Sequence, residues 1–203
     1  MIRIVKNETK QKLFADVAEK ITEDELKKSF LEMCNYIPDY IFYIPASSSG
    51  KYHNKQQCKK HGQLIHSWMA NDVLEYLISL EHISEKLTEH EKNLMRIAIC
   101  FHDVLKGGWE YEGHTKQLHP RYAVSWLHYN CEYCGISDED EKELCSLVVS
   151  HSGQWNQDKT GAVILPKPIT FEQQLIHEAD YLASRKDLTY VISKEKKRGL
   201  RQL

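Results

Sequence analysis

The sequence has no long apolar segment and almost no net charge. No hydrophobic run approaches the 18 residues that a membrane-spanning helix needs, so we expect no membrane partner. Lysine and arginine (27) nearly balance aspartate and glutamate (29), which excludes a broadly basic nucleic-acid binder. The first residues, MIRIVKNETKQK, contain no apolar signal core. We therefore expect a cytoplasmic chain.

The chain also lacks the features of a sheet protein and of a disulfide scaffold. Its β-branched stretches are too short for a sheet, although VILP at 163–166 is compatible with one short strand. Six scattered cysteines in a chain of 203 residues indicate reduced thiols. His128, Cys131 and Cys134 have zinc-like spacing, but the sequence supplies no obvious fourth ligand.

Helical periodicity dominates what remains. Apolar residues recur every three or four positions over 63–80, and Pro120 suits the first turn of a helix that starts at His119. Helix-start signals are frequent: they are the pairs Thr22/Glu25, Thr88/Glu91 and Thr170/Gln173, and Ser137 before DEDE. These patterns predict an all-α, single-domain helical bundle of about six to eight helices.

We divide this single domain, residues 1–203, into three parts. Residues 1–60 comprise one or two helices over 9–36 and most of a long polar loop over 37–62. Residues 61–185 form the helical core. Residues 186–203 are a basic tail, which we expect to be frayed or exposed to solvent. In the core, the helix that starts after Thr88 is expected to run to about Leu105, before two glycines stop it.

Histidine is abundant, with 11 residues, and several histidines fall on inward faces of predicted helices. A lone inward histidine is usually a hydrogen-bonded core residue. Several that converge with carboxylates inside a helical bundle are instead the ligand set of a divalent metal. The candidates come from separate helices, and they are His66, His102, Asp103, His119, His151 and Asp180.

These residues resemble a known signature. His66, the adjacent His102-Asp103 and the late Asp180 resemble the H…HD…D pattern of the HD-domain metal-dependent phosphohydrolases, and HDVLK resembles the family's HD-x-x-K. The segments SSSGKYH (47–53) and SHSGQW (150–155) resemble a phage and bacterial subgroup. One departure is Ser152, because many two-metal members have a second histidine directly after the position of His151.

The resemblance implies one or two divalent ions, from among Mn, Fe, Ni, Co and Zn. It implies that the first ion is held by His66, His102, Asp103 and Asp180. It implies that His119 and His151 complete a second site, with Asp103 as the bridge. Asp103 and Lys106 are the expected catalytic residues. The expected reaction is hydrolysis of a nucleotide phosphoester, preferably a phosphodiester such as a cyclic nucleotide or a nucleic-acid end.

Two polar loops supply candidate substrate contacts. Lys51, Tyr52 and His53 follow a glycine, and such a loop can offer N–H groups and a cation to a phosphate. Gln154 can read a base edge, and Trp155 can stack on a base. Four further residues lie near the site in sequence without a firm assignment: His61, His114 as a general acid, His177 as a rival ligand, and Arg185 as a phosphate contact or a surface ion pair.

Other functions fit the same residues. Within hydrolysis, the alternative is a (deoxy)nucleotide mono- or triphosphate hydrolase. From other classes, a di-iron HD-type oxygenase uses a similar ligand set, and a non-catalytic module that binds a nucleotide or a protein needs no metal. The small size of the chain is compatible with a homo-oligomer.

Overall fold

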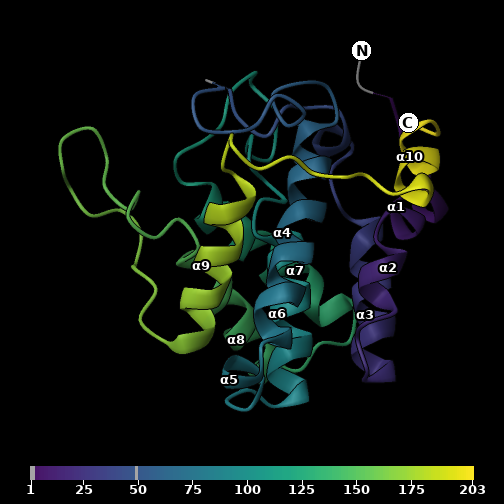
Figure 1. Cartoon of the computed structure of the whole chain (residues 1–203), viewed down its shortest axis with the longest axis vertical. Coiled ribbons are helices and arrows are strands. Elements are labelled where there is room, and N and C mark those ends of the chain that lie inside the picture. Colours follow the sequence, from purple (N-terminus) through teal and green to yellow (C-terminus); the bar gives the residue numbers. More distant parts are fainter. Residues whose placement is uncertain (1–2, 49) are drawn as a thin grey trace.

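The computed structural model describes residues 3–48 and 50–203, and it is all-α as predicted (Figure 1). The helices of this part of the chain are α1 (Asn7–Leu13), α2 (Ala15–Ala18), α3 (Asp24–Asn35), η1 (Asp39–Phe42), α4 (Gly62–Ser79), α5 (Glu81–Ser84), α6 (Glu89–Phe101), α7 (His119–Tyr133), α8 (Asp138–Val149), α9 (Phe171–Ala183) and α10 (Lys194–Leu200). There are more of them than the predicted six to eight helices because α2 and α5 are single turns and the tail adds α10. None of them is both long and apolar enough to cross a bilayer.

The core is built around α4 and α6. Helix α4 packs against α6 and α9, while α8 packs against α6, α7 and α9. Helices α1 to α3 lie along one side of this group, next to α10 (Figure 1). The fully buried ring of Phe101 joins the parts, because its centroid lies 5.4 Å from that of Phe30 and 5.0 Å from that of Trp126. This packing fixes the helix ends that carry the candidate ligands.

Local capping explains several helix starts, with one exception. The boxes at Thr88 and Thr170 are present, and Ser137 caps α8. The box predicted at Thr22 is wrong, since α3 begins at Asp24 without a side-chain cap. Thr22 is instead paired with Asn93 of α6: its N–H donates to Oδ1 (3.2 Å) and its Oγ1 accepts from Nδ2 (3.0 Å). A tertiary contact therefore takes the hydroxyl that the local motif would use.

Helix α6 ends at Phe101, earlier than the predicted end near Leu105. The imidazole Nδ1 of His102 donates to the carbonyl of Ile99 (2.7 Å), which lies in the last turn of α6 and lacks an intrahelical partner. Beyond this point, tight turns lead to Gly108, whose φ of 90° favours glycine. The segment VILP makes no strand, because residues 157–163 of the described chain contain only one isolated bridge, between Gln157 and Val163.

The basic tail is largely exposed to solvent, as predicted, but it is folded rather than frayed. Helix α10 packs against α1, although none of its residues is fully buried. The Lys196 ammonium lies 2.8 Å from a carboxylate oxygen of Asp16 and donates to the Tyr190 hydroxyl (2.7 Å). Backbone groups of Tyr190 bond in both directions with the side chain of Gln56, in the polar loop. The tail thus fastens this loop to the bundle.

We expect Lys196→Met to lower the free energy of unfolding by about 1–2 kcal/mol, because the variant leaves Asp16 and the Tyr190 hydroxyl without their shared donor. Chemical denaturation at neutral pH measures this loss. Lys197→Met is the matched control, since Lys197 is exposed on the same helix. Equal stability of the two variants would contradict the role of Lys196.

A second prediction concerns His90, whose Nδ1 lies 2.9 Å from Glu23 and whose Nε2 lies 2.8 Å from Asp140. The hydrogen bond with Glu23 raises the pKa of His90 above its ordinary value. A raised folded-state pKa stabilises the protein fully below the unfolded value of about 6.5, and the contribution disappears as the pH rises through the folded value.

We therefore expect His90→Gln to be less stable than the parent near about pH 6 and equally stable near about pH 9. Thermal unfolding at both pH values measures the difference. His82→Gln, at another exposed histidine, is the control. A stability difference that persists unchanged at the higher pH would contradict this ionic role.

Candidate metal centre

Five helices deliver imidazoles and carboxylates to one end of the bundle. The contributing residues are His66 in α4, His102 and Asp103 directly after α6, His119 at the start of α7, His151 just after α8, and Asp180 in α9. The residues His66 and His102 have exposed fractions of 0%, and Asp103 is 3% exposed. Burial of such groups costs several kcal/mol unless they are paired, so their mutual geometry decides what the site can do.

Asp103 lies between two groups of ligand atoms. Its Oδ2 accepts hydrogen bonds from Lys106 (2.5 Å) and from Gln63 Nε2 (3.1 Å). Its Oδ1 faces His119 Nε2 (2.9 Å) and His151 Nε2 (3.8 Å). The carboxylate therefore has one oxygen directed to each side, which is the arrangement of a bridging ligand.

The Oδ2 side holds the other three candidate ligands. His66 Nε2 lies 3.3 Å from His102 Nε2 and 2.9 Å from Asp180 Oδ1. His102 Nε2 lies 3.4 Å from the same Asp180 oxygen. The ligand atoms of His66, His102 and Asp103 all lie within 4.8 Å of one another, as do those of Asp103, His119 and His151.

The hydrogen bonds of the Nδ1 atoms determine the protonation of the Nε2 atoms, which face the centre of the cluster. Nδ1 of His119 pairs with the carbonyl of Lys116 (2.8 Å), and Nδ1 of His151 pairs with that of Val148 (2.7 Å). These nitrogens must carry protons, so in the neutral rings each Nε2 presents a lone pair. The two Nε2 atoms nevertheless face each other at 3.1 Å.

Lone pairs this close repel unless a cation lies between them. Two imidazole nitrogens bound to one tetrahedral ion at about 2.1 Å lie about 3.4 Å apart, close to the separations here. The Oδ1 atom of Asp103 is buried, and no described residue donates a hydrogen bond to it. The donor set and its orphaned oxygen therefore fit a divalent transition-metal ion.

The ionisation of the cluster points the same way. Burial opposes a charge on His102, but the Asp103 and Asp180 carboxylates raise its pKa to about 10. Burial lowers the pKa of His151 to about 3. Burial raises the pKa of Asp103, but Lys106 and His102 outweigh this effect and hold that pKa well below its usual range. The two carboxylates therefore favour a positive charge at the centre of the cluster, which a bound ion would also supply.

A cavity of about 200 Å³ opens onto this cluster. Tyr52, His53 and Trp155, which were predicted to contact substrate, line it together with Lys106 and four of the ligands. His53 packs edge-on against His66, and both of its ring nitrogens are buried without a described partner. Lys51 and Gln154 are exposed and do not line the cavity.

The other histidines near the site in sequence lie outside the ligand cluster. His61 pairs through Nδ1 with the Phe42 carbonyl, and His114 is exposed on the loop after Lys106. His177 contacts the second group of ligands indirectly, because its Nδ1 donates to the His151 carbonyl (2.8 Å). Gly153, with φ of 55°, leaves room for the His177 ring, since a Cβ at this position would collide with it.

Sequence reasoning missed three residues of the site. Gln63 lies one turn before His66 on the same helix face, a spacing from which its contact with Asp103 could have been inferred. Ser152 and Ser184 line the cavity without any local signal. The zinc-like trio is not assembled: His128 is exposed and pairs with Glu141 (2.7 Å), and no metal-ligand group among the described residues includes Cys131 or Cys134.

Comparison with known proteins agrees with this geometry. The family model for the HD domain matches residues 65–185, a stretch that contains all six candidate ligands. Neither the curated proteins nor the solved structures contain a match. The chain belongs to the HD domain family.

The cluster predicts that the purified protein binds a divalent transition metal. We expect His102→Ala and Asp103→Ala to weaken binding of Mn²⁺ or Zn²⁺ by at least about 100-fold, because each removes a ligand atom from the centre of the group. Elemental analysis and calorimetry after chelation and reloading measure this loss. His114→Ala is the control from outside the cluster. Unchanged metal content in the Asp103 variant would contradict the assignment.

Proposed function

We propose that the protein is a metal-dependent phosphohydrolase that cleaves a nucleotide phosphoester, and that its preferred substrate is a phosphodiester. The observation that carries this proposal is the position of Asp103, between two groups of imidazoles at the floor of a cavity that Lys106 also lines. A divalent ion bound here would activate a water molecule and withdraw charge from the phosphoryl oxygens.

In this proposal, the six residues hold one or two ions. His66, His102 and Asp180 bind on the Oδ2 side of Asp103, and His119 and His151 bind on the Oδ1 side. The Nδ1 hydrogen bonds to backbone carbonyls orient the rings and keep each Nε2 free for a metal. The candidate ions are Mn, Fe, Ni, Co and Zn, and elemental analysis of the purified protein identifies the one that is bound.

Lys106 has two roles in the proposed reaction. Its hydrogen bond to Oδ2 fixes the rotamer of Asp103, and its positive charge faces an anionic ligand in the cavity. His53, neutral because burial lowers its pKa to about 3, offers ring nitrogens to the bound phosphoester. Lys51 and Gln154, which are exposed and do not line the cavity, would contact only the more distant parts of a nucleotide or nucleic-acid end.

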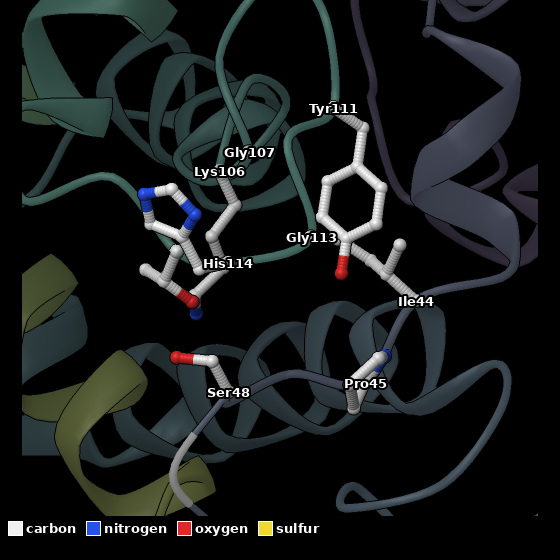
Figure 2. Close-up of a pocket in the computed structure, with 9 residues that line it drawn as sticks. Ile44, Pro45, Ser48, Lys106, Gly107, Tyr111, Gly113 and His114 are labelled. Carbon is white, nitrogen blue, oxygen red and sulfur yellow. The ribbon is translucent and has the colours of Figure 1, made fainter.

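The preference for a diester is supported by two cavities that share Lys106 in their lining. One is the cavity over the metal centre, and the other has a volume of about 130 Å³. Figure 2 shows the hydroxyl groups of Ser48 and Tyr111 pointing into this second cavity. A phosphodiester carries two organic substituents, and the two cavities offer a place for each. A monoester leaves one of them without a ligand group.

The decisive experiment compares a cyclic nucleotide, a dinucleotide, a nucleoside monophosphate and a nucleoside triphosphate with each candidate metal. We expect the parent to hydrolyse the diesters. Activity should fall below detection in Asp103→Ala, and kcat should fall by about 10²–10³-fold in Lys106→Met. Lys59→Met, at an exposed lysine, should retain full activity.

Other outcomes separate the alternatives. Turnover of monophosphates or triphosphates alone would reject the diester preference. Oxygen-dependent turnover with two bound irons would indicate that the protein is an oxygenase rather than a hydrolase. Nucleotide binding without turnover under any metal would indicate a binding module.

A further inference from the structure

Two aromatic rings and a guanidinium line the outer part of the metal-site cavity, and a third ring, that of Tyr181, packs against Trp155 and Arg185. We call this group the aromatic rim, and its members are Tyr52, Trp155, Tyr181 and Arg185. Tyr52 and Trp155 line the cavity, yet they remain 44% and 42% exposed. Large exposed aromatic surface at the mouth of a polar site is surface that a ligand can cover.

The aromatic rim is held in place before any ligand arrives. The rings of Trp155 and Tyr181 are stacked, with centroids 5.7 Å apart and planes inclined by 22°. The guanidinium of Arg185 lies 3.9 Å from the Tyr181 centroid, and its Nε donates to the Tyr181 carbonyl (3.1 Å). A supported platform of this kind loses little conformational freedom when it binds a flat ligand.

The rings of Tyr52 and Trp155 do not stack on each other. Their centroids are 6.4 Å apart, and their planes are tilted by 48°. Neither ring is therefore covered by stacking on the other, and a planar ring in the cavity can contact either one.

The charge at the rim defines the ligand further. Arg185 also lines the cavity, and within the described chain no carboxylate lies within 4.0 Å of its guanidinium. The positive charge of Arg185 is therefore available to an anion in the cavity. A ligand that places a planar ring against Tyr52 or Trp155 and a negative charge near Arg185 is a nucleotide rather than a peptide or a lipid.

We infer that Tyr52 and Trp155 stack on the nucleobase of the substrate, and that Arg185 attracts its phosphate toward the metal centre. This inference rests on the proposed function, because it takes the phosphoester to lie at the metals. It assigns the selection of a base-bearing substrate to the aromatic rim rather than to the metal ligands. Arg185 and Tyr181, which no local motif marks, then become specificity-determining residues.

The test compares binding of AMP with binding of ribose 5-phosphate, which has the same phosphate without a base. Calorimetry with the metal-loaded protein measures both affinities, and chromatography of the mixtures afterwards checks that neither ligand has been turned over. We expect the protein to bind AMP about tenfold more tightly, the range expected for one stacked base. Trp155→Leu should bring AMP to the affinity of ribose 5-phosphate and leave the latter unchanged. Arg185→Gln should weaken both ligands.

Two further variants guard against a merely structural effect. Trp155→Phe should restore most of the preference for AMP, because a smaller ring still stacks. Trp109→Leu changes a tryptophan that is 52% exposed and contacts Tyr129 outside the cavity, so it should behave like the parent. Equal affinities for AMP and ribose 5-phosphate in the parent, or equal weakening of both by Trp155→Leu, would overturn the inference.

The two proposals fail in different ways. Base-dependent binding that is lost in Trp155→Leu, without hydrolysis of any phosphoester under any metal, would support the aromatic rim and overturn the proposed function. Metal-dependent diester hydrolysis with no base-dependent binding would support the proposed function and overturn the role of the aromatic rim.

Discussion

The charge on Asp103 is the constraint on which the rest of this end of the molecule depends. A carboxylate that is 3% exposed must be neutralised from within the protein, and Lys106 and the surrounding imidazoles provide that compensation. No single helix can supply these partners. Lys106 and His102 lie close to Asp103 in the sequence, whereas His119 comes from the start of α7, so α7 must begin beside the segment that follows α6. The neutralisation of Asp103 therefore depends on how the helices of the bundle are arranged.

The ligands also complete the helices that carry them. His102 and His151 each follow a helix, and each donates Nδ1–H to a carbonyl three residues earlier, in the last turn. Carbonyls in the last turn lack an intrahelical partner, and the imidazole gives each of these two a side-chain donor; the Val148 carbonyl also accepts the backbone N–H of His151 (3.3 Å). The hydrogen bond from the imidazole also selects the tautomer that leaves Nε2 free for a metal. Helix termination and ligand orientation thus have the same cause, which explains why α6 ends earlier than its apolar pattern indicates.

The parts that the sequence predicted well are governed by local physics. Apolar periodicity and the caps at Thr88 and Thr170 depend on neighbours within one turn, and the all-α fold follows from them. The capping box at Thr22 was wrong, and the exposed tail is folded rather than frayed, because distant residues decide both. Asn93 takes the Thr22 hydroxyl, and Asp16 and Tyr190 hold Lys196. Similarly, the order and helix positions of the ligands were readable, but their convergence required tertiary structure.

The metal centre and the aromatic rim share helix α9, and one member of the rim comes from outside the helical core. The candidate ligands come from helix ends in the stretch that matches the HD domain, whereas Tyr52 belongs to a loop before that stretch. That loop is held by Gln57, whose amide donates to the Ala183 carbonyl (2.9 Å), and by the bond pair between Gln56 and Tyr190. A change in the loop or tail can therefore alter which group reaches the rim while Asp103 and its partners keep their geometry. On the proposed function, the stretch that matches the HD domain holds the metal ligands together with Trp155, Tyr181 and Arg185, and the loop adds Tyr52 to them.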